Sequence, residues 1–136
     1  YAHVAPVLTL VSRALGVDPA LLRIYDPYFC NGAVERHLLP LGFGSVHNVN
    51  EDFYAVQRAG TLPSFDILLT NPPYSGTHPE RLLEFCTEIA RPWLLLMPNW
   101  VYDRAHFVDS LPALKPAFYI VPRKRYHYWT PRGRRS

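Results

Sequence analysis

Apolar residues along the chain form short continuous runs that alternate with segments of helical periodicity. Apolar runs bounded by Pro, Gly or Asn are typical of buried strands, and they predict strands at residues 21–27, 65–71 and 92–98. A weaker, polar strand is predicted at residues 45–51. Apolar residues that recur at helical spacing predict helices at residues 4–15, 32–42, 77–90 and 104–111, with a short helix or a turn at 52–60. Two final runs, 117–122 and 125–131, predict a closing hairpin.

Local signals mark the ends of two of these helices. Gly16 is expected to end the first helix. The expected helix at residues 77–90 carries Thr77 and Glu80 at the spacing of a capping box, and Pro79 suits its first turn. Its inner face is expected to be formed by Leu82, Leu83, Cys86, Ile89 and Ala90.

The alternation of helices with short apolar strands predicts an α/β fold. Strands without a polar face belong to a parallel sheet that is covered on both sides, an open sandwich. Ligands of such sheets bind at the carboxyl ends of the strands, where the strand order reverses. Unusual polar or proline-containing segments follow all four expected strands, at residues 26–32, 50–52, 71–76 and 98–103. We therefore expect a ligand site at this edge.

The bulk composition is that of an ordinary globular protein. The chain has 136 residues, which predicts one domain over residues 1–136, and 49% of them are hydrophobic. There is no apolar run of about 18 residues, so no membrane span is expected. The two cysteines do not suggest a disulfide framework, so free thiols in an intracellular protein are expected. The six histidines show no ligand spacing, so no metal site is expected.

Positive charge is concentrated at the C-terminus. The formal net charge is +3, yet the residues from Arg123 onward carry six Arg or Lys and no acid, so the rest of the chain has a charge of −3. Cations interleaved with aromatic rings suit phosphates and unstacked bases, which predicts nucleic-acid contacts from Arg123, Lys124, Arg125, Tyr126, Trp129 and Arg132. The alternative is a half-buried hairpin with a solvated basic edge, over residues of about 117–136.

Three segments in order carry a family resemblance: "IYDPYFCNGA", "NVNEDFY" and "FDILLTNPPY". From about Ile24 to Asp103 the chain resembles class I S-adenosylmethionine-dependent amino-methyltransferases, in the branch with an (Asp/Asn/Ser)-Pro-Pro-(Tyr/Phe) motif typified by N6-adenine methyltransferases. The resemblance implies a Rossmann-like class I methyltransferase sandwich with a mostly parallel sheet. Because few residues separate "EDFY" from "FDILL", we expect a reduced version without one strand and helix of larger members.

The resemblance implies catalytic roles for Asn71, Pro72, Pro73 and Tyr74. An exocyclic amine is a poor nucleophile because its lone pair is delocalised. The side-chain oxygen of Asn71 and the backbone carbonyl of Pro72 would accept its hydrogens and orient it. Two prolines fix the backbone, and Tyr74 would stack on the base. The alternative is a turn that ends the strand.

The resemblance also implies S-adenosyl-L-methionine as the cofactor. The loop after the first strand would hold it, with contacts from Asp26, Pro27, Tyr28, Cys30 and Gly32, and Asn71 would complete the site. Cys30 stands where the family has its first glycine, and a Cβ there narrows the approach of the cofactor.

Two adjacent acids follow the second expected strand. The resemblance assigns Glu51 to the ribose hydroxyls and Asp52 to the adenine side. A helix N-cap role is the alternative for either acid.

These features predict methylation of the adenine exocyclic amine in RNA or DNA, on a single-stranded or flipped base. Two alternatives stay open: methylation of a glutamine side-chain amide in a protein, and a non-catalytic methyltransferase-like module that binds nucleic acid or a partner. A protein partner or a further flanking domain would supply target specificity, because one small domain has little room for it.

Overall fold

A computed structural model describes residues 1–114 and 118–126 of the chain. Within these residues, four parallel strands form one sheet in the order β2-β1-β3-β4. The strands are β1 (Ile24–Tyr25), β2 (Val46–His47), β3 (Ile67–Thr70) and β4 (Trp93–Leu95). All four lie inside the predicted runs, so the α/β prediction with a parallel sheet is confirmed.

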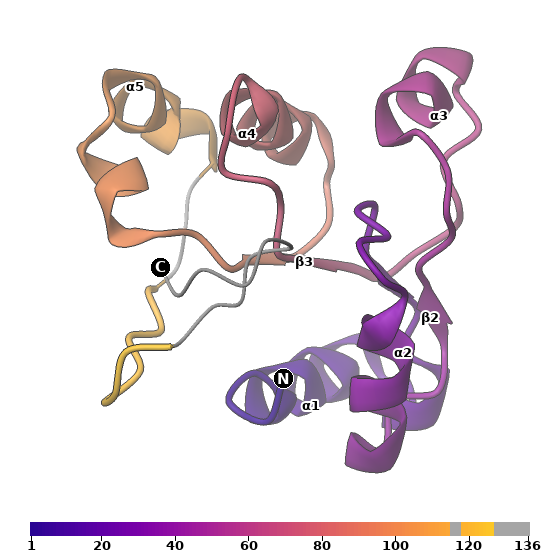
Figure 1. Ribbon diagram of the computed structural model, residues 1–136. Coiled ribbons are helices and arrows are strands. Elements are labelled where there is room, and N and C mark those ends of the chain that lie inside the picture. Colours follow the sequence, from indigo (N-terminus) through magenta and orange to yellow (C-terminus); the bar gives the residue numbers. More distant parts are fainter. Residues whose placement is uncertain (115–117, 127–136) are drawn as a thin grey trace.

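Helices cover both faces of the sheet, as predicted. Figure 1 shows α3, α4 and α5 on one side and α1 and α2 on the other. The helices of the described residues are α1 (Ala5–Leu15), α2 (Ala33–Leu38), α3 (Phe53–Ala59), α4 (His78–Glu88) and α5 (Ala105–Leu114), with 3₁₀ turns η1 (Pro19–Leu21), η2 (Leu39–Leu41) and η3 (Asn99–Asp103).

Strand alternation divides the interior into two apolar cores. Ile67 and Leu69 of β3 point to one face and Leu68 points to the other. The core on the side of α1 and α2 contains Leu8, Leu22, Ile24, Val34, Leu38, Phe43, Ile67 and Leu69. The core on the other side contains Tyr25, Phe53, Phe65, Leu68, Leu82, Leu83, Phe85, Cys86, Val101, Phe107 and Leu114. Both cores fix the strands from which the polar loops emerge.

The helix ends agree with the sequence signals in part. Gly16 ends α1 in the left-handed conformation, with φ of 66°. The expected helix 32–42 ends earlier, at Leu38, because Pro40 lacks the amide hydrogen an α-helix needs and sits in the first turn of η2 instead. The capping box at Thr77 is wrong: its side chain makes no capping hydrogen bond to α4. Pro79 occupies the first turn of α4, as expected.

The buried face of α4 also differs slightly from expectation. Leu82, Leu83 and Cys86 are buried as predicted, whereas Ala90 lies beyond the helix and is exposed. Phe85 is buried in its place and packs edge-on against Phe53 of α3. The last helix, α5, continues past the expected 104–111 and contains Pro112. No helix among the described residues has the length and apolar character needed to cross a bilayer.

The predicted C-terminal hairpin is not formed in the described residues. Positions 118–122 of its first strand and positions 125 and 126 of its second form no strand, and the other hairpin positions lie outside the described residues. A strand needs a partner and a core that covers one of its faces. Phe118 is 60% exposed and Val121 is 83% exposed, so neither face of this run is covered.

Candidate functional site

The strand order reverses between β1 and β3. The chain passes from β1 to β2 on one side of the sheet and then returns to β3 on the other side, and Tyr25 pairs with Leu68. The loops that follow β1 and β3 therefore begin next to each other and lead away in opposite directions, which is where sheets of this type bind ligands. Asp26 opens one loop and Asn71 opens the other.

The Asp26 carboxylate joins these two loops. It is 6% exposed, and its Oδ1 accepts hydrogen bonds from the Thr70 hydroxyl at 2.5 Å and from the Tyr28 amide at 3.1 Å. The Asn48 side chain donates to the carbonyl oxygens of Asp26 at 3.1 Å and Tyr28 at 3.3 Å, which adds the segment after β2. Burial raises the pKa of Asp26 to about 6, although both hydrogen bonds to its carboxylate act in the opposite direction.

The predicted cofactor loop makes two left-handed turns before α2. Cys30 has φ of 52° and Gly32 has φ of 67°. Cys30 thus adopts a backbone conformation that glycine favours, at the steric cost of a Cβ. A Cβ at Gly32 would lie 2.9 Å from the outer end of the Phe29 ring, so a side chain there would displace this ring in addition to adopting a strained positive φ. Pro27 is buried under this loop and Cys30 is exposed.

The Asn-Pro-Pro-Tyr segment sits at the end of β3 with its polar groups near the surface. Asn71 and Pro73 are exposed, Pro72 is buried and Tyr74 is half-buried. The Tyr74 hydroxyl lies 2.5 Å from Asn71 Oδ1 and 3.0 Å from the Leu96 carbonyl oxygen, just beyond β4. The segment is therefore tied by Tyr74 to the neighbouring strand end as well as to its own asparagine.

The two acids after β2 have different roles. Asp52 is the N-cap of α3, because its Oδ1 accepts from the amides of Tyr54 at 2.9 Å and Ala55 at 3.3 Å. Glu51 makes no such cap; its Oε1 lies 3.2 Å from Nε2 of His47. The N-cap alternative is thus confirmed for Asp52, and Glu51 is the acid that presents its side chain near the strand ends.

A cluster of side chains lies beside the predicted cofactor loop, and sequence reasoning identified only Tyr28 among its members. The Tyr28 hydroxyl lies 3.1 Å from that of Tyr54, which in turn hydrogen-bonds Nδ1 of His78. The Tyr54 and His78 rings stack, and the Arg81 guanidinium lies 3.5 Å from the centre of the Tyr54 ring. Three elements thus converge: the loop after β1, the start of α3 and the start of α4. The available signal was position alone, since Tyr28 lies in the loop after β1 and Tyr54 and His78 lie in the first turns of the helices that follow β2 and β3.

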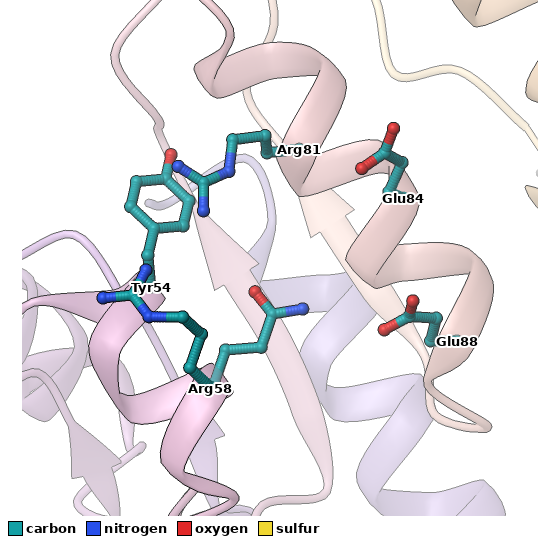
Figure 2. Close-up of a pocket in the computed structure, with 6 residues that line it drawn as sticks. Tyr54, Arg58, Arg81, Glu84 and Glu88 are labelled. Carbon is teal, nitrogen blue, oxygen red and sulfur yellow. The ribbon is translucent and has the colours of Figure 1, made fainter.

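A polar groove runs from this cluster between α3 and α4. It has a volume of about 390 Å³. Figure 2 shows Arg81 of α4 reaching across to Tyr54, while Arg58 of α3 lies on the opposite wall from Glu84 and Glu88. The two arginines and two glutamates balance in charge, so the groove has no net preference for an anion.

The described part of the basic segment is exposed. Arg123, Lys124 and Arg125 all face solvent. Tyr126 stacks on His3, with ring centres 5.7 Å apart, and its hydroxyl lies 2.5 Å from His3 Nδ1. The segment is thereby held against the residues that precede α1. Trp129 and Arg132, the other predicted nucleic-acid contacts, lie outside the described residues.

No cluster of three or more His, Cys, Asp or Glu side chains in residues 1–114 and 118–126 is arranged to hold a metal ion. Cys30 and Cys86 are free thiols, the first exposed and the second buried.

Comparisons of the chain with known protein families, with curated proteins and with solved structures found no match. Function is therefore inferred from the residues of the site itself.

Proposed function

We propose that the chain is an S-adenosylmethionine-dependent methyltransferase that acts on the exocyclic amine of adenine in RNA or DNA. The observation that carries the proposal is the hydrogen bond between Thr70 and Asp26. It holds the loop that resembles the cofactor loop beside the Asn-Pro-Pro-Tyr segment, at the reversal point of a parallel sheet. Methyl transfer needs this proximity, because donor and acceptor must meet in line.

The Asn-Pro-Pro-Tyr segment has the groups that would orient an amine. Asn71 Oδ1 and the Pro72 carbonyl oxygen are acceptors for its two hydrogens. Pro72 is buried and the two ring-constrained residues fix the backbone, so the carbonyl is held in place before substrate arrives. The ring of Tyr74 is the stacking surface for the base, a contact worth about 1–3 kcal/mol. These groups position the reactants and need no general base.

The loop after β1 fits the cofactor that the resemblance implies. When bound, S-adenosylmethionine supplies the reactive methyl group on its sulfonium. Left-handed turns at Cys30 and Gly32 let the backbone approach a ligand closely, and the exposed carboxylate of Glu51 is suited to ribose hydroxyls. Because the Asp52 carboxylate caps α3, we keep the ribose contact of Glu51 and propose no adenine contact for Asp52.

The basic segment supports a nucleic acid as the substrate. Three exposed cations, Arg123 to Arg125, favour a polyanion over a protein. Methylation of a glutamine side-chain amide is the second candidate, because an amide NH₂ presents the same two hydrogens to Asn71 and Pro72.

Calorimetric titration with S-adenosylmethionine tests the proposal. The wild-type chain should bind, and Glu51→Ala should bind about tenfold more weakly, the factor for one lost hydrogen bond to a charged group. Glu35→Ala is the matched control, since Glu35 is an exposed acid on α2. A folded chain that takes up no cofactor at millimolar concentration would refute both methyltransferase candidates and leave a non-catalytic binding module.

A further inference from the structure

The Tyr74 hydroxyl faces two acceptors with a single proton. It lies 2.5 Å from Asn71 Oδ1 and 3.0 Å from the Leu96 carbonyl oxygen. Neither oxygen carries a hydrogen, so the hydroxyl can donate to only one of them at a time. When it donates to Asn71, the Leu96 carbonyl faces a lone pair of the hydroxyl, which is repulsive. In this arrangement only one of the two contacts of the hydroxyl is a hydrogen bond.

A flip of the Asn71 side-chain amide about its Cβ–Cγ bond, which exchanges the positions of oxygen and nitrogen, removes the conflict. The exchange places Nδ2 where Oδ1 was, with almost no change in shape. The Tyr74 hydroxyl then donates to the Leu96 carbonyl and accepts a hydrogen from Asn71 Nδ2, so both contacts are hydrogen bonds. The same flip moves Oδ1 to the outer end of the side chain, at the exposed rim of the strand.

We propose that Tyr74 is a positioning residue that selects which end of the Asn71 amide faces the substrate. Its hydroxyl, anchored on the Leu96 carbonyl, holds Nδ2 and presents Oδ1 outward. The proposal rests on the proposed function and explains why a hydroxyl is useful on a ring whose other task is stacking. It also gives the end of β4 a role in the site, because Leu96 directly follows that strand.

The orientation has a consequence for substrate choice. An outward Oδ1 accepts a hydrogen from an exocyclic amine, whereas an outward Nδ2 places two donors against each other and repels the amine. The outward Nδ2 would favour a carbonyl group at the same position of the base. Tyr74 therefore favours an amino-purine over the corresponding oxo-purine.

A double-mutant cycle tests the proposal through activity. Tyr74→Phe keeps the stacking ring and removes the hydroxyl, so kcat should fall about tenfold, the factor for one hydrogen bond, with a smaller change in KM. Asn71→Asp has two equivalent oxygens that need no selection. In that background, Tyr74→Phe should change kcat by less than about threefold. Tyr119→Phe, at an exposed tyrosine, is the control for the substitution itself. Equal losses in both backgrounds would overturn the proposal.

A second readout is independent of methyl transfer. Proton–nitrogen correlation NMR reports the side-chain amide of Asn71, assigned by its absence in Asn71→Asp. Tyr74→Phe should shift these signals and speed their exchange with solvent, while the Asn48 amide stays as it is. Unchanged Asn71 signals would contradict the proposal. A wild-type chain that shows the coupling but transfers no methyl group would keep the positioning role and refute the proposed function.

Discussion

The buried carboxylate of Asp26 gives the site a dependence on pH. Burial raises its pKa from 3.8 to about 6, so the folded chain holds this proton more tightly than the unfolded chain. The stabilisation is complete below about pH 4 and is lost as pH rises through about 6. We expect this group to lower the free energy of unfolding by about 3 kcal/mol across that interval. Urea unfolding at a series of pH values measures it.

Asp26→Asn should remove this dependence. The amide oxygen can still accept from the Thr70 hydroxyl and the Tyr28 amide, so the variant should be more stable than wild type at pH 7. Asp66→Asn is the control with the opposite sign, because the Arg23 guanidinium lowers the pKa of Asp66. The Arg23–Asp66 ion pair stabilises the fold at neutral pH, and this stabilisation is lost as pH falls and Asp66 is protonated. If Asp26→Asn unfolds with the pH profile of wild type, the assignment to Asp26 is wrong.

The left-handed conformation of Cys30 leads to a second prediction at the scale of the residue. A residue with a Cβ is destabilised by about 1–2 kcal/mol in this conformation. Glycine removes this strain, but part of the gain is lost because the unfolded chain has more conformational entropy with glycine. Cys30→Gly should therefore raise the free energy of unfolding by about 0.5–1 kcal/mol in urea unfolding. Cys30→Ala keeps the Cβ and should show no gain. A gain of the same size for alanine would show that the thiol, rather than backbone strain, is responsible.

The cap of α3 is the clearest prediction at the scale of the element. Asp52 satisfies two of the amides that a helix start leaves open. Asp52→Ala should lower the free energy of unfolding by about 1 kcal/mol, and Asp52→Ser should recover most of it. Chemical unfolding measures both. If Asp52→Ser instead retains stability but loses cofactor binding, Asp52 contacts the ligand, and its role is not confined to the helix cap.

Elements were predictable where local pattern and burial agree. All four strands and five helices of the described residues lie within or close to their predicted ranges, because each apolar run is covered by a helix. Pro40 and Thr77 show where local signals failed: a proline shortened one helix, and a capping side chain did not form its bond. The run at 118–122 shows the tertiary limit, since strand propensity without a covering core does not produce a strand.

The candidate site shows the same division. The placement of Asp26, Glu51 and Asn71 after strands could be predicted, because parallel strands end at one edge of the sheet. The cluster of Tyr54, His78 and Arg81 could not, because it depends on how two helices pack against each other. The double contact of the Tyr74 hydroxyl likewise depends on the neighbouring strand end.

At the scale of the whole molecule, the basic segment predicts a salt-dependent interaction. Replacing Arg123, Lys124 and Arg125 with Gln should weaken binding of single-stranded RNA, and the slope of log K against log salt should fall by about 2, since each phosphate contact contributes about 0.7. Fluorescence anisotropy at several salt concentrations measures this. Arg13→Gln is the control, a single exposed cation on α1. An unchanged slope would show that this segment makes no contact with the phosphates.

The most direct test of the central claim is a transfer assay with methyl-labelled S-adenosylmethionine against separate pools of RNA, DNA and protein. We predict that the wild-type chain labels the exocyclic amine of adenine in a nucleic acid. Asn71→Ala should bind the cofactor as wild type does and transfer no label, because the acceptor for the amine is gone. Normal transfer by Asn71→Ala, or no label in any pool while the cofactor is bound, would contradict the account.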